Sequence, residues 1–184
     1  MQNNFILTPI VFNNIFTSTE CTYIKNIISK DNFIPATVES SNREHTINEQ
    51  DRKVLNQSIP NKDKYKWIYK RIQLCINKAN IKFNFDIKEH SISNILVLKY
   101  GEWDFYRKHK DVWIWDAAGR RLSVIVQLSE PSDYSWCELI FEKWNLVAPK
   151  NIWSVIVFPS CLTHEVIPLI KWERYALVSW FKRN

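Results

Sequence analysis

The chain has 184 residues, of which 46% are hydrophobic and 24% charged, which fits one globular domain with its own core and excludes a disordered chain. It contains only two glycines, so the glycine-rich loops of the commonest nucleotide-binding proteins are excluded. The formal net charge is +6, but lysines and arginines are spread along the sequence, so charge alone identifies no partner.

The cysteines and the N-terminal residues indicate the cellular compartment to expect. The four cysteines form no Cys-x-x-Cys pair, so their spacing fits neither a zinc module nor a dense disulfide framework. Residues 1–5 lack the features of a secretory signal, and the uncharged stretch 151–163 is too short to span a bilayer. We therefore expect a reduced, cytoplasmic protein (bacterial, or in the host cytoplasm if viral) with no membrane partner.

The residues before 92 predict two helices and a long connection. Thr17 and Glu20 form a capping box, which predicts a helix over 18–30. A second helix is expected over 62–79, where apolar residues recur at helical spacing. Residues 35–60 between them are polar and irregular, and connections of this length often carry function.

From residue 92 onward, short runs of β-branched and aromatic residues alternate with turn residues. They predict strands over 93–100, 104–110, 121–129, 138–142, 154–158, 164–168 and 174–182. This order predicts an α+β, mainly β fold, a jelly roll with the N-terminal helices packed on one face. We expect a single domain over 1–184, with helical support over 1–91 and the jelly-roll core over 92–184.

His109 and Asp111 lie at the end of the second predicted strand. Residues i and i+2 of a strand face the same side, so the imidazole and the carboxylate converge while Lys110 faces away. A neutral imidazole beside a carboxylate is half of a site for a first-row transition metal. Taken alone, the pair is more simply a surface histidine beside a surface aspartate.

Two later residues extend this pattern. His164 begins a predicted strand, where a lone histidine is usually structural. Arg174 opens the last strand, and its guanidinium keeps its charge when buried, so it requires an anion from Glu165, Glu173 or a ligand. Alternation along this strand assigns two faces: Arg174, Ala176, Val178 and Trp180 on one, and Tyr175, Leu177, Ser179 and Phe181 on the other.

Together these residues follow one order: His-x-Asp, several strands, a second histidine, then an arginine on the next strand. Two histidines and one carboxylate on one face form the facial triad of non-haem Fe(II) oxygenases, and an arginine fork suits a carboxylate. The motifs lie in segments 98–111, 121–129, 131–134, 138–139, 157–168 and 173–176. Over residues 92–182 the chain thereby resembles the Fe(II)- and 2-oxoglutarate-dependent dioxygenases, and within them the prolyl 4-hydroxylase-like branch.

This resemblance implies a double-stranded β-helix and assigns the principal roles. His109, Asp111 and His164 match the catalytic iron ligands. Arg174 matches the residue that binds the C5 carboxylate of 2-oxoglutarate, and Tyr100 matches an aromatic position that lines the cosubstrate pocket.

Other positions match with less definite roles. Gln127 stands where many members have a Tyr or Thr that assists the C5 carboxylate, and Tyr106 matches a position near the substrate entrance. Trp113 and Trp115 form an aromatic wall for substrate if their loop stays near the metal, or they fill the core. We expect Trp153 to lie in the core, like Trp180.

The chain departs from the family pattern at two turns. Relatives often carry Gly-Gly before the Glu-Leu pair, where this chain has Trp136-Cys137. The glycine that usually opens the strand before the second histidine is replaced near Trp153-Ser154. Neither change touches a ligand. His45, in the polar connection, and His90, in the turn before the first predicted strand, are expected to bind no metal.

The implied cofactors are Fe(II), 2-oxoglutarate and O2, with ascorbate as a candidate reductant. The implied reaction is hydroxylation of an unactivated C–H, with succinate and CO2 as co-products. The substrate this favours is a proline in a protein or peptide, but no residue specifies it, so a small molecule or a nucleic acid base is the alternative. A non-enzymatic jelly-roll binding module is a further hypothesis, which leaves Arg174 unexplained.

Overall fold

Antiparallel sheets and two helices make up the structure, a computed structural model that describes residues 7–28, 32–39, 44–85, 87, 90–112 and 119–183. The helices of these residues are α1 (Ser18–Asn26) and α2 (Lys66–Phe83). The strands before residue 101 are β1 (Ile10–Phe12), β2 (Ile34–Pro35), β3 (Val38–Glu39), β4 (His45–Thr46), β5 (Arg52–Lys53), β6 (Leu55–Ile59), β7 (His90–Ile92) and β8 (Ile95–Tyr100). The later strands are β9 (Phe105–His109), β10 (Arg120–Gln127), β11 (Tyr134–Trp136), β12 (Leu139–Phe141), β13 (Leu146–Val147), β14 (Val155–Pro159), β15 (His164–Val166), β16 (Leu169–Trp172) and β17 (Arg174–Arg183).

The larger sheet has eight strands, in the order β1-β14-β10-β17-β8-β6-β2 with β7 also paired to β17. Its two faces serve two cores because alternate residues of a strand point to opposite sides. Along β17, Leu177 and Phe181 join the core beneath the helices, whereas Ala176 and Val178 join the core between the sheets. The alternation predicted for this strand is confirmed.

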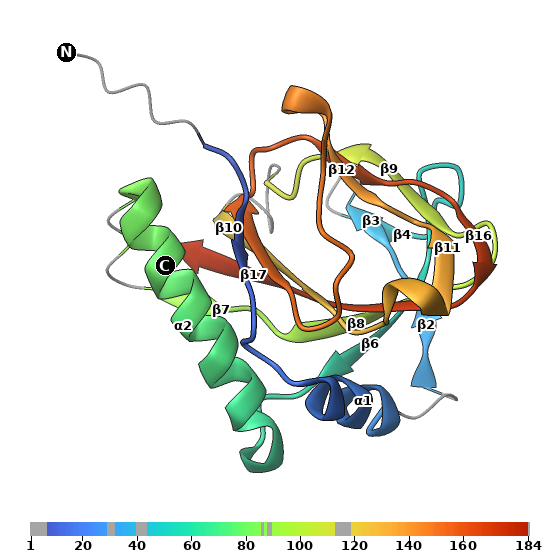
Figure 1. Cartoon of the computed structure of the whole chain (residues 1–184). Helices are drawn as coiled ribbons and strands as arrows, with labels where there is room; N and C mark the ends of the chain where they lie inside the picture. Colours follow the sequence, from blue (N-terminus) through green and yellow to red (C-terminus); the bar gives the residue numbers. More distant parts are fainter. Residues whose placement is uncertain are drawn as a thin grey trace.

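Both helices lie on one side of the larger sheet, and β9 and β12 lie on the other (Figure 1). The predicted stripe of α2 is buried against the sheet and includes Ile68, Ile72 and Ile76. The capping box at Thr17 is present, but α1 ends at Asn26, earlier than predicted. Neither helix is long and apolar enough to cross a membrane.

The smaller sheet has the order β13-β12-β15-β9-β5 and faces the larger one across a second core. This core contains Phe141 and Val166 from the smaller sheet and Leu98, Ile156 and Phe158 from the larger. Because β15 pairs directly with β9, two segments far apart in sequence lie side by side. The fold thereby brings the second predicted histidine next to the first predicted pair.

The prediction that residues 35–60 are irregular is wrong. Strand β6 pairs with β8 in the larger sheet, and β5 pairs with β9 in the smaller one. The side chains of β6 are largely polar and only Ile59 is buried, so backbone pairing with β8 holds this strand where composition gave no sign of it. His90 likewise lies in β7 rather than in a turn.

Several residues other than glycine adopt a left-handed backbone. Their φ values are positive at Asn14, Asn84, Trp103, Trp136, Cys137, Trp144, Asn145, Trp153 and Trp172. For a residue with a β-carbon, this backbone conformation costs about 1–3 kcal/mol. Asparagine is among the residues that tolerate it best. Neither glycine of the chain has a positive φ, so every left-handed position among the described residues is held by a residue with a β-carbon.

The thiols should differ sharply in reactivity. Burial raises the pKa of Cys21 and of Cys75 to about 11, and burial also raises the pKa of Cys137. Cys161 is exposed, and all four cysteines are free. We expect a thiol reagent at about pH 8 to modify one thiol per native chain and all of them after denaturation. Labelling of a Cys161→Ser variant in the native state would contradict this assignment.

Candidate active site

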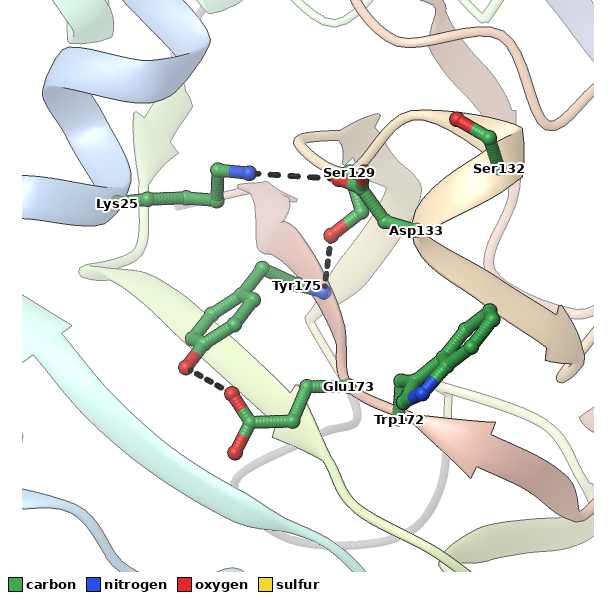
Figure 2. Close-up of a pocket in the computed structure, with 7 residues that line it drawn as sticks. All are labelled: Lys25, Ser129, Ser132, Asp133, Trp172, Glu173 and Tyr175. Carbon is green, nitrogen blue, oxygen red and sulfur yellow. Dashed lines mark hydrogen bonds and ion pairs between the residues drawn. The ribbon is translucent and has the colours of Figure 1, made fainter.

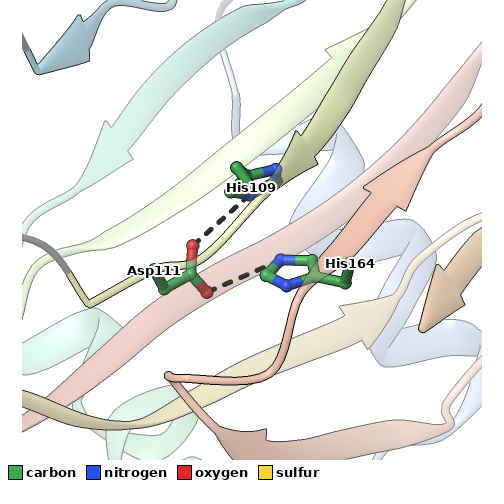
Figure 3. A group of neighbouring side chains, drawn as sticks. All are labelled: His109, Asp111 and His164. Atoms are coloured by element: carbon green, nitrogen blue, oxygen red, sulfur yellow. Dashed lines mark ion pairs between the residues drawn. The ribbon is translucent and has the colours of Figure 1, made fainter. Parts of the chain in front are cut away.

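Two strands of the smaller sheet bring three ligand-type side chains together (Figure 3). His164 of β15 pairs in register with His109 of β9, and Asp111 follows two residues after His109. The three candidate ligand atoms lie within 4.8 Å of one another. The His109 Nε2 to Asp111 Oδ1 distance is 3.5 Å, and the His164 Nε2 to Asp111 Oδ2 distance is 3.7 Å.

Asp111 reaches this point in a different way from the one predicted. The strand ends at His109, so Asp111 is not its strand neighbour two residues on. Instead, the backbone N–H of Asp111 donates to the carbonyl of Ser160 at 3.0 Å, and the N–H of Val112 donates to the same oxygen at 3.1 Å. The segment between β14 and β15 therefore positions the carboxylate.

Backbone carbonyls orient both imidazoles. His109 Nδ1 lies 2.7 Å from the carbonyl oxygen of Arg107, and His164 Nδ1 lies 2.9 Å from that of Leu162. Because a carbonyl only accepts, each Nδ1 carries the hydrogen and each Nε2 keeps its lone pair. Both lone pairs are on the nitrogens that face Asp111, which is the tautomer that a metal ligand requires.

Burial and charge set the protonation states of this cluster. Burial lowers the pKa of His164 to about 4, although the carboxylate of Asp111 opposes this shift. Burial raises the pKa of Asp111, but the positive charges that His164 and His109 carry when protonated, together with hydrogen bonds from His109 and Ser123, outweigh it and hold that pKa well below its usual range. At neutral pH the cluster therefore offers an ionised carboxylate and a neutral His164 imidazole.

Aromatic rings hold the two histidines in place. The ring of Tyr106 stacks on His109 with centroids 3.5 Å apart and planes 16° apart. Phe158 packs edge-on against His164 at 4.8 Å. The position of Tyr106 near a substrate entrance stays a prediction, and Trp113 and Trp115 lie outside the described residues.

Arg174 lies in the same core as the cluster, at the start of β17, and is only 1% exposed. Among the described residues no carboxylate forms an ion pair with it, so neither Glu165 nor Glu173 supplies its anion. Its Nη2 donates to Gln127 Oε1 at 2.9 Å and its Nη1 approaches Cys137 Sγ at 3.9 Å. A buried cation with only neutral neighbours is costly unless an anion joins it.

The surroundings of Arg174 include further donors without an acceptor. The Nε of Arg174 and the hydroxyl of Tyr134 are buried and have no hydrogen-bond partner in the described part of the chain. The rings of Tyr100 and Tyr134 lie 5.3 and 6.0 Å from the guanidinium carbon. Gln127 is engaged at both ends of its amide, since its Oε1 accepts from Arg174 and its Nε2 donates to the Pro149 carbonyl at 3.0 Å.

Sequence reasoning therefore named Gln127 and missed Tyr134 and Cys137 as neighbours of Arg174. The signal for Tyr134 was absent, because the short strand β11 that carries it was not predicted. In the structure Gln127 hydrogen-bonds the arginine, while the Tyr134 hydroxyl has no hydrogen-bond partner among the described residues.

An open hollow of about 490 Å³ lies elsewhere and contains none of the predicted site residues (Figure 2). Its lining includes Lys25, Asp133, Trp172, Glu173 and Tyr175. The charges there are already paired: Lys25 Nζ lies 3.6 Å from Asp133, and Glu173 pairs with Lys99 at 2.6 Å and accepts from the Tyr175 hydroxyl at 2.9 Å. Since Tyr175 and Arg174 are successive residues of β17, they face opposite sides.

Solved structures share this fold over nearly the whole chain. A viral collagen prolyl hydroxylase from Paramecium bursaria Chlorella virus 1, solved with 2-oxoglutarate, matches with a TM-score of 0.73 and 16% identity, over 96% of each chain. A Trichoplax adhaerens prolyl hydroxylase in complex with a hypoxia-inducible-factor peptide matches with a TM-score of 0.72 and 18% identity, over 97% of this chain and 84% of that one.

The sequence similarity to curated proteins is weaker, and it is again to hydroxylases. A PKHD-type hydroxylase of a Picosynechococcus strain is 27% identical over 107 residues, which are 56% of this chain and 48% of the relative. The chain thus spans about half the length of the curated relatives it matches. No protein-family model matches the chain.

Fold and comparisons together define the class: the chain has the fold of the 2-oxoglutarate- and iron-dependent oxygenases, with a His-Asp-His cluster in its core. Within that class its structural neighbours are prolyl hydroxylases, so the resemblance inferred from the sequence motifs is confirmed at the level of the fold.

Proposed function

We propose that the chain is an Fe(II)- and 2-oxoglutarate-dependent dioxygenase that hydroxylates a proline in a protein or peptide. The observation that carries this proposal is a buried His-Asp-His cluster in the same core as a buried arginine without a counter-charge. A structural metal site alone would give no reason for that arginine. We further propose that the two facing sheets form the double-stranded β-helix of this class.

The donor set fits Fe(II). His109 and His164 would ligate through Nε2 and Asp111 through its carboxylate, which together make a facial triad with open positions. Iron bound there with 2-oxoglutarate and O2 supplies the oxidising chemistry, with succinate and CO2 as co-products. The chain's own part is to keep both imidazoles in the ligating tautomer, to hold the carboxylate ionised, and to bury Asp111 and His164.

The surroundings of Arg174 fit the far carboxylate of 2-oxoglutarate. Arg174 would bind this carboxylate, the Tyr134 hydroxyl would add a hydrogen bond, and Tyr100 would line the pocket. Gln127 and Cys137 would steady the guanidinium without neutralising it, because both are uncharged at neutral pH. The cation therefore stays free for the ligand.

The substrate is proposed by likeness alone. The Trichoplax neighbour is solved with a peptide, and the other neighbour is a collagen prolyl hydroxylase, so a peptidyl proline is the favoured substrate. Free proline and single-stranded nucleic acid are the alternatives to be compared with it.

One experiment tests the reaction and another the substrate. Adding Fe(II) and then 2-oxoglutarate without oxygen should produce a visible metal-to-ligand charge-transfer band that neither addition gives alone. On admitting air, succinate should form faster with a proline-rich peptide than with free proline or a DNA oligonucleotide. Absence of the band would overturn the cofactor assignment, and a band with succinate stimulated only by DNA or free proline would overturn the substrate alone.

Replacing Tyr134 with phenylalanine should weaken cosubstrate binding without disturbing the fold, because only an unpartnered hydroxyl is removed. A hydrogen bond to a charged group contributes about 1.5–3 kcal/mol, so KM for 2-oxoglutarate should rise roughly tenfold or more while iron binding is unchanged. Tyr175→Phe is the matched control, since its hydroxyl donates to Glu173 outside the site. Equal KM values for the two variants would remove Tyr134 from the pocket.

A further inference from the structure

Most tryptophans of the described chain occupy backbone positions that suit glycine. Seven tryptophans are described, and five of them have left-handed φ angles: Trp103 (66°), Trp136 (66°), Trp144 (75°), Trp153 (68°) and Trp172 (71°). Only a few per cent of residues other than glycine have a positive φ, and asparagine, aspartate and histidine are the enriched types. A bulky aromatic residue is thus the least expected occupant of such a position.

Three of these tryptophans are the third residue of a hydrogen-bonded β-turn. The N–H of Asp104 donates to the Gly101 carbonyl at 3.0 Å, which places Trp103 in that position. Asn145 donates to Glu142 at 3.1 Å around Trp144, and Ser154 donates to Asn151 at 3.2 Å around Trp153. A positive φ at the third residue, with none at the second, is typical of the type II turn, where glycine is the preferred third residue.

The other two lie where strands are interrupted. At Trp136 the pairing of β11 with β16 shifts register, and a left-handed residue in such a bulge is typically glycine. Trp172 ends β16 and is separated from β17 only by Glu173, so it lies at a one-residue connection between strands of two different sheets. At four of the five positions the turn or bulge is therefore one in which glycine is preferred, and at Trp172 the positive φ alone favours it.

Four of these five indole rings bury little surface, whereas Trp153 is partly buried against the core beneath the helices. Trp103, Trp136 and Trp172 are each 60–61% exposed, and Trp144 is 46% exposed. The remaining described tryptophans behave differently: Trp67 lies in α2 against Phe16 at 6.1 Å, and Trp180 lies in β17 with Arg120 stacked 3.9 Å above its ring. The backbone thus separates these five tryptophans from Trp67 and Trp180, and four of the five also have exposed side chains.

We infer that positions 103, 136, 144, 153 and 172 are glycine in the protein that its own cell makes. One cause accounts for all five: a codon translated as tryptophan in the printed sequence is decoded as glycine in that cell. UGA is such a codon, since some genetic codes assign it to tryptophan and others to glycine. The same cause explains why bulky residues stand at positions 136 and 153, where relatives of the proposed class carry glycine.

This inference does not rest on the proposed enzyme activity, and the gene itself offers the first test. The five positions should share one codon, UGA, whereas Trp67 and Trp180 should be encoded by UGG. Peptides of the chain isolated from the cell of origin should show glycine at the five positions by mass spectrometry. UGG at these positions, or tryptophan in those peptides, would overturn the inference.

A stability measurement supplies the second test. Changing all five positions to glycine should raise the thermal unfolding midpoint by roughly 2–4 °C per position, because the left-handed strain is relieved. Changing the same five positions to alanine removes the same indoles but keeps the β-carbon. The rise in the unfolding midpoint should therefore be clearly smaller for the alanine variant. Trp67→Gly and Trp180→Gly should lower the midpoint. An alanine variant that gains as much as the glycine variant would overturn the argument from the backbone.

Discussion

Replacing Asp111 with asparagine should abolish iron-dependent turnover. The carboxylate lies between the two imidazole Nε2 atoms and is the only anion of the candidate triad. An amide of the same shape keeps the packing but removes the charge that attracts Fe(II) and balances its charge. Loss of a residue that merely orients a ligand lowers metal affinity about 10–100-fold, so loss of a ligand should cost at least about 100-fold.

The measurement is an anaerobic Fe(II) titration followed through the charge-transfer band, with succinate formation as the second readout. Glu165→Gln is the matched control, because Glu165 follows His164 in β15 and faces the other side of the strand. This control removes one negative charge near the cluster without removing a ligand. If Asp111→Asn and Glu165→Gln bound Fe(II) equally well, the cluster would not be the metal site.

Replacing Arg174 with methionine should separate stability from function. The guanidinium is fully buried and no carboxylate neutralises it, so an apolar side chain of similar length should leave the ligand-free protein at least as stable. Cosubstrate binding should nevertheless weaken by about 100-fold or more, since a two-point charged contact is lost. A variant that is no less stable and yet inactive would identify a residue retained for a ligand rather than for the fold.

Thermal unfolding with Fe(II) under anaerobic conditions, with and without 2-oxoglutarate, provides the readout. The unchanged chain should gain stability from 2-oxoglutarate by mass action, and the Arg174→Met chain should not. Lys99→Met is the control, because Lys99 belongs to the adjacent strand but pairs with Glu173 outside the core. The anchor assignment fails if 2-oxoglutarate still stabilises Arg174→Met as much as it stabilises the control.

Local and periodic signals in the sequence are sufficient to predict several helices and strands. The capping box at Thr17 and the apolar stripe of α2 predict their helices because helix signals lie within a few residues of one another. The two faces of β17 follow from its alternation. The order His109, Asp111, His164 and Arg174 predicts both the cluster and the buried cation.

What the sequence did not predict depends on partners that are distant in the chain. Strand β6 is polar and is held by pairing with β8, so its own residues carry no alternating pattern that reveals it. Asp111 is held by Ser160 rather than by strand geometry, and Tyr134 meets Arg174 across the core. Such contacts are set by tertiary packing, which local patterns do not encode.

The register between β9 and β15 restricts how this gene can vary in length. His109 and His164 face each other as a directly paired couple, and the side chains of a strand alternate with every residue. An insertion or deletion of a single residue between the pairing contacts and either histidine would turn that imidazole to the opposite side of the sheet. Such mutations should therefore be eliminated by selection when they fall in these two short strands.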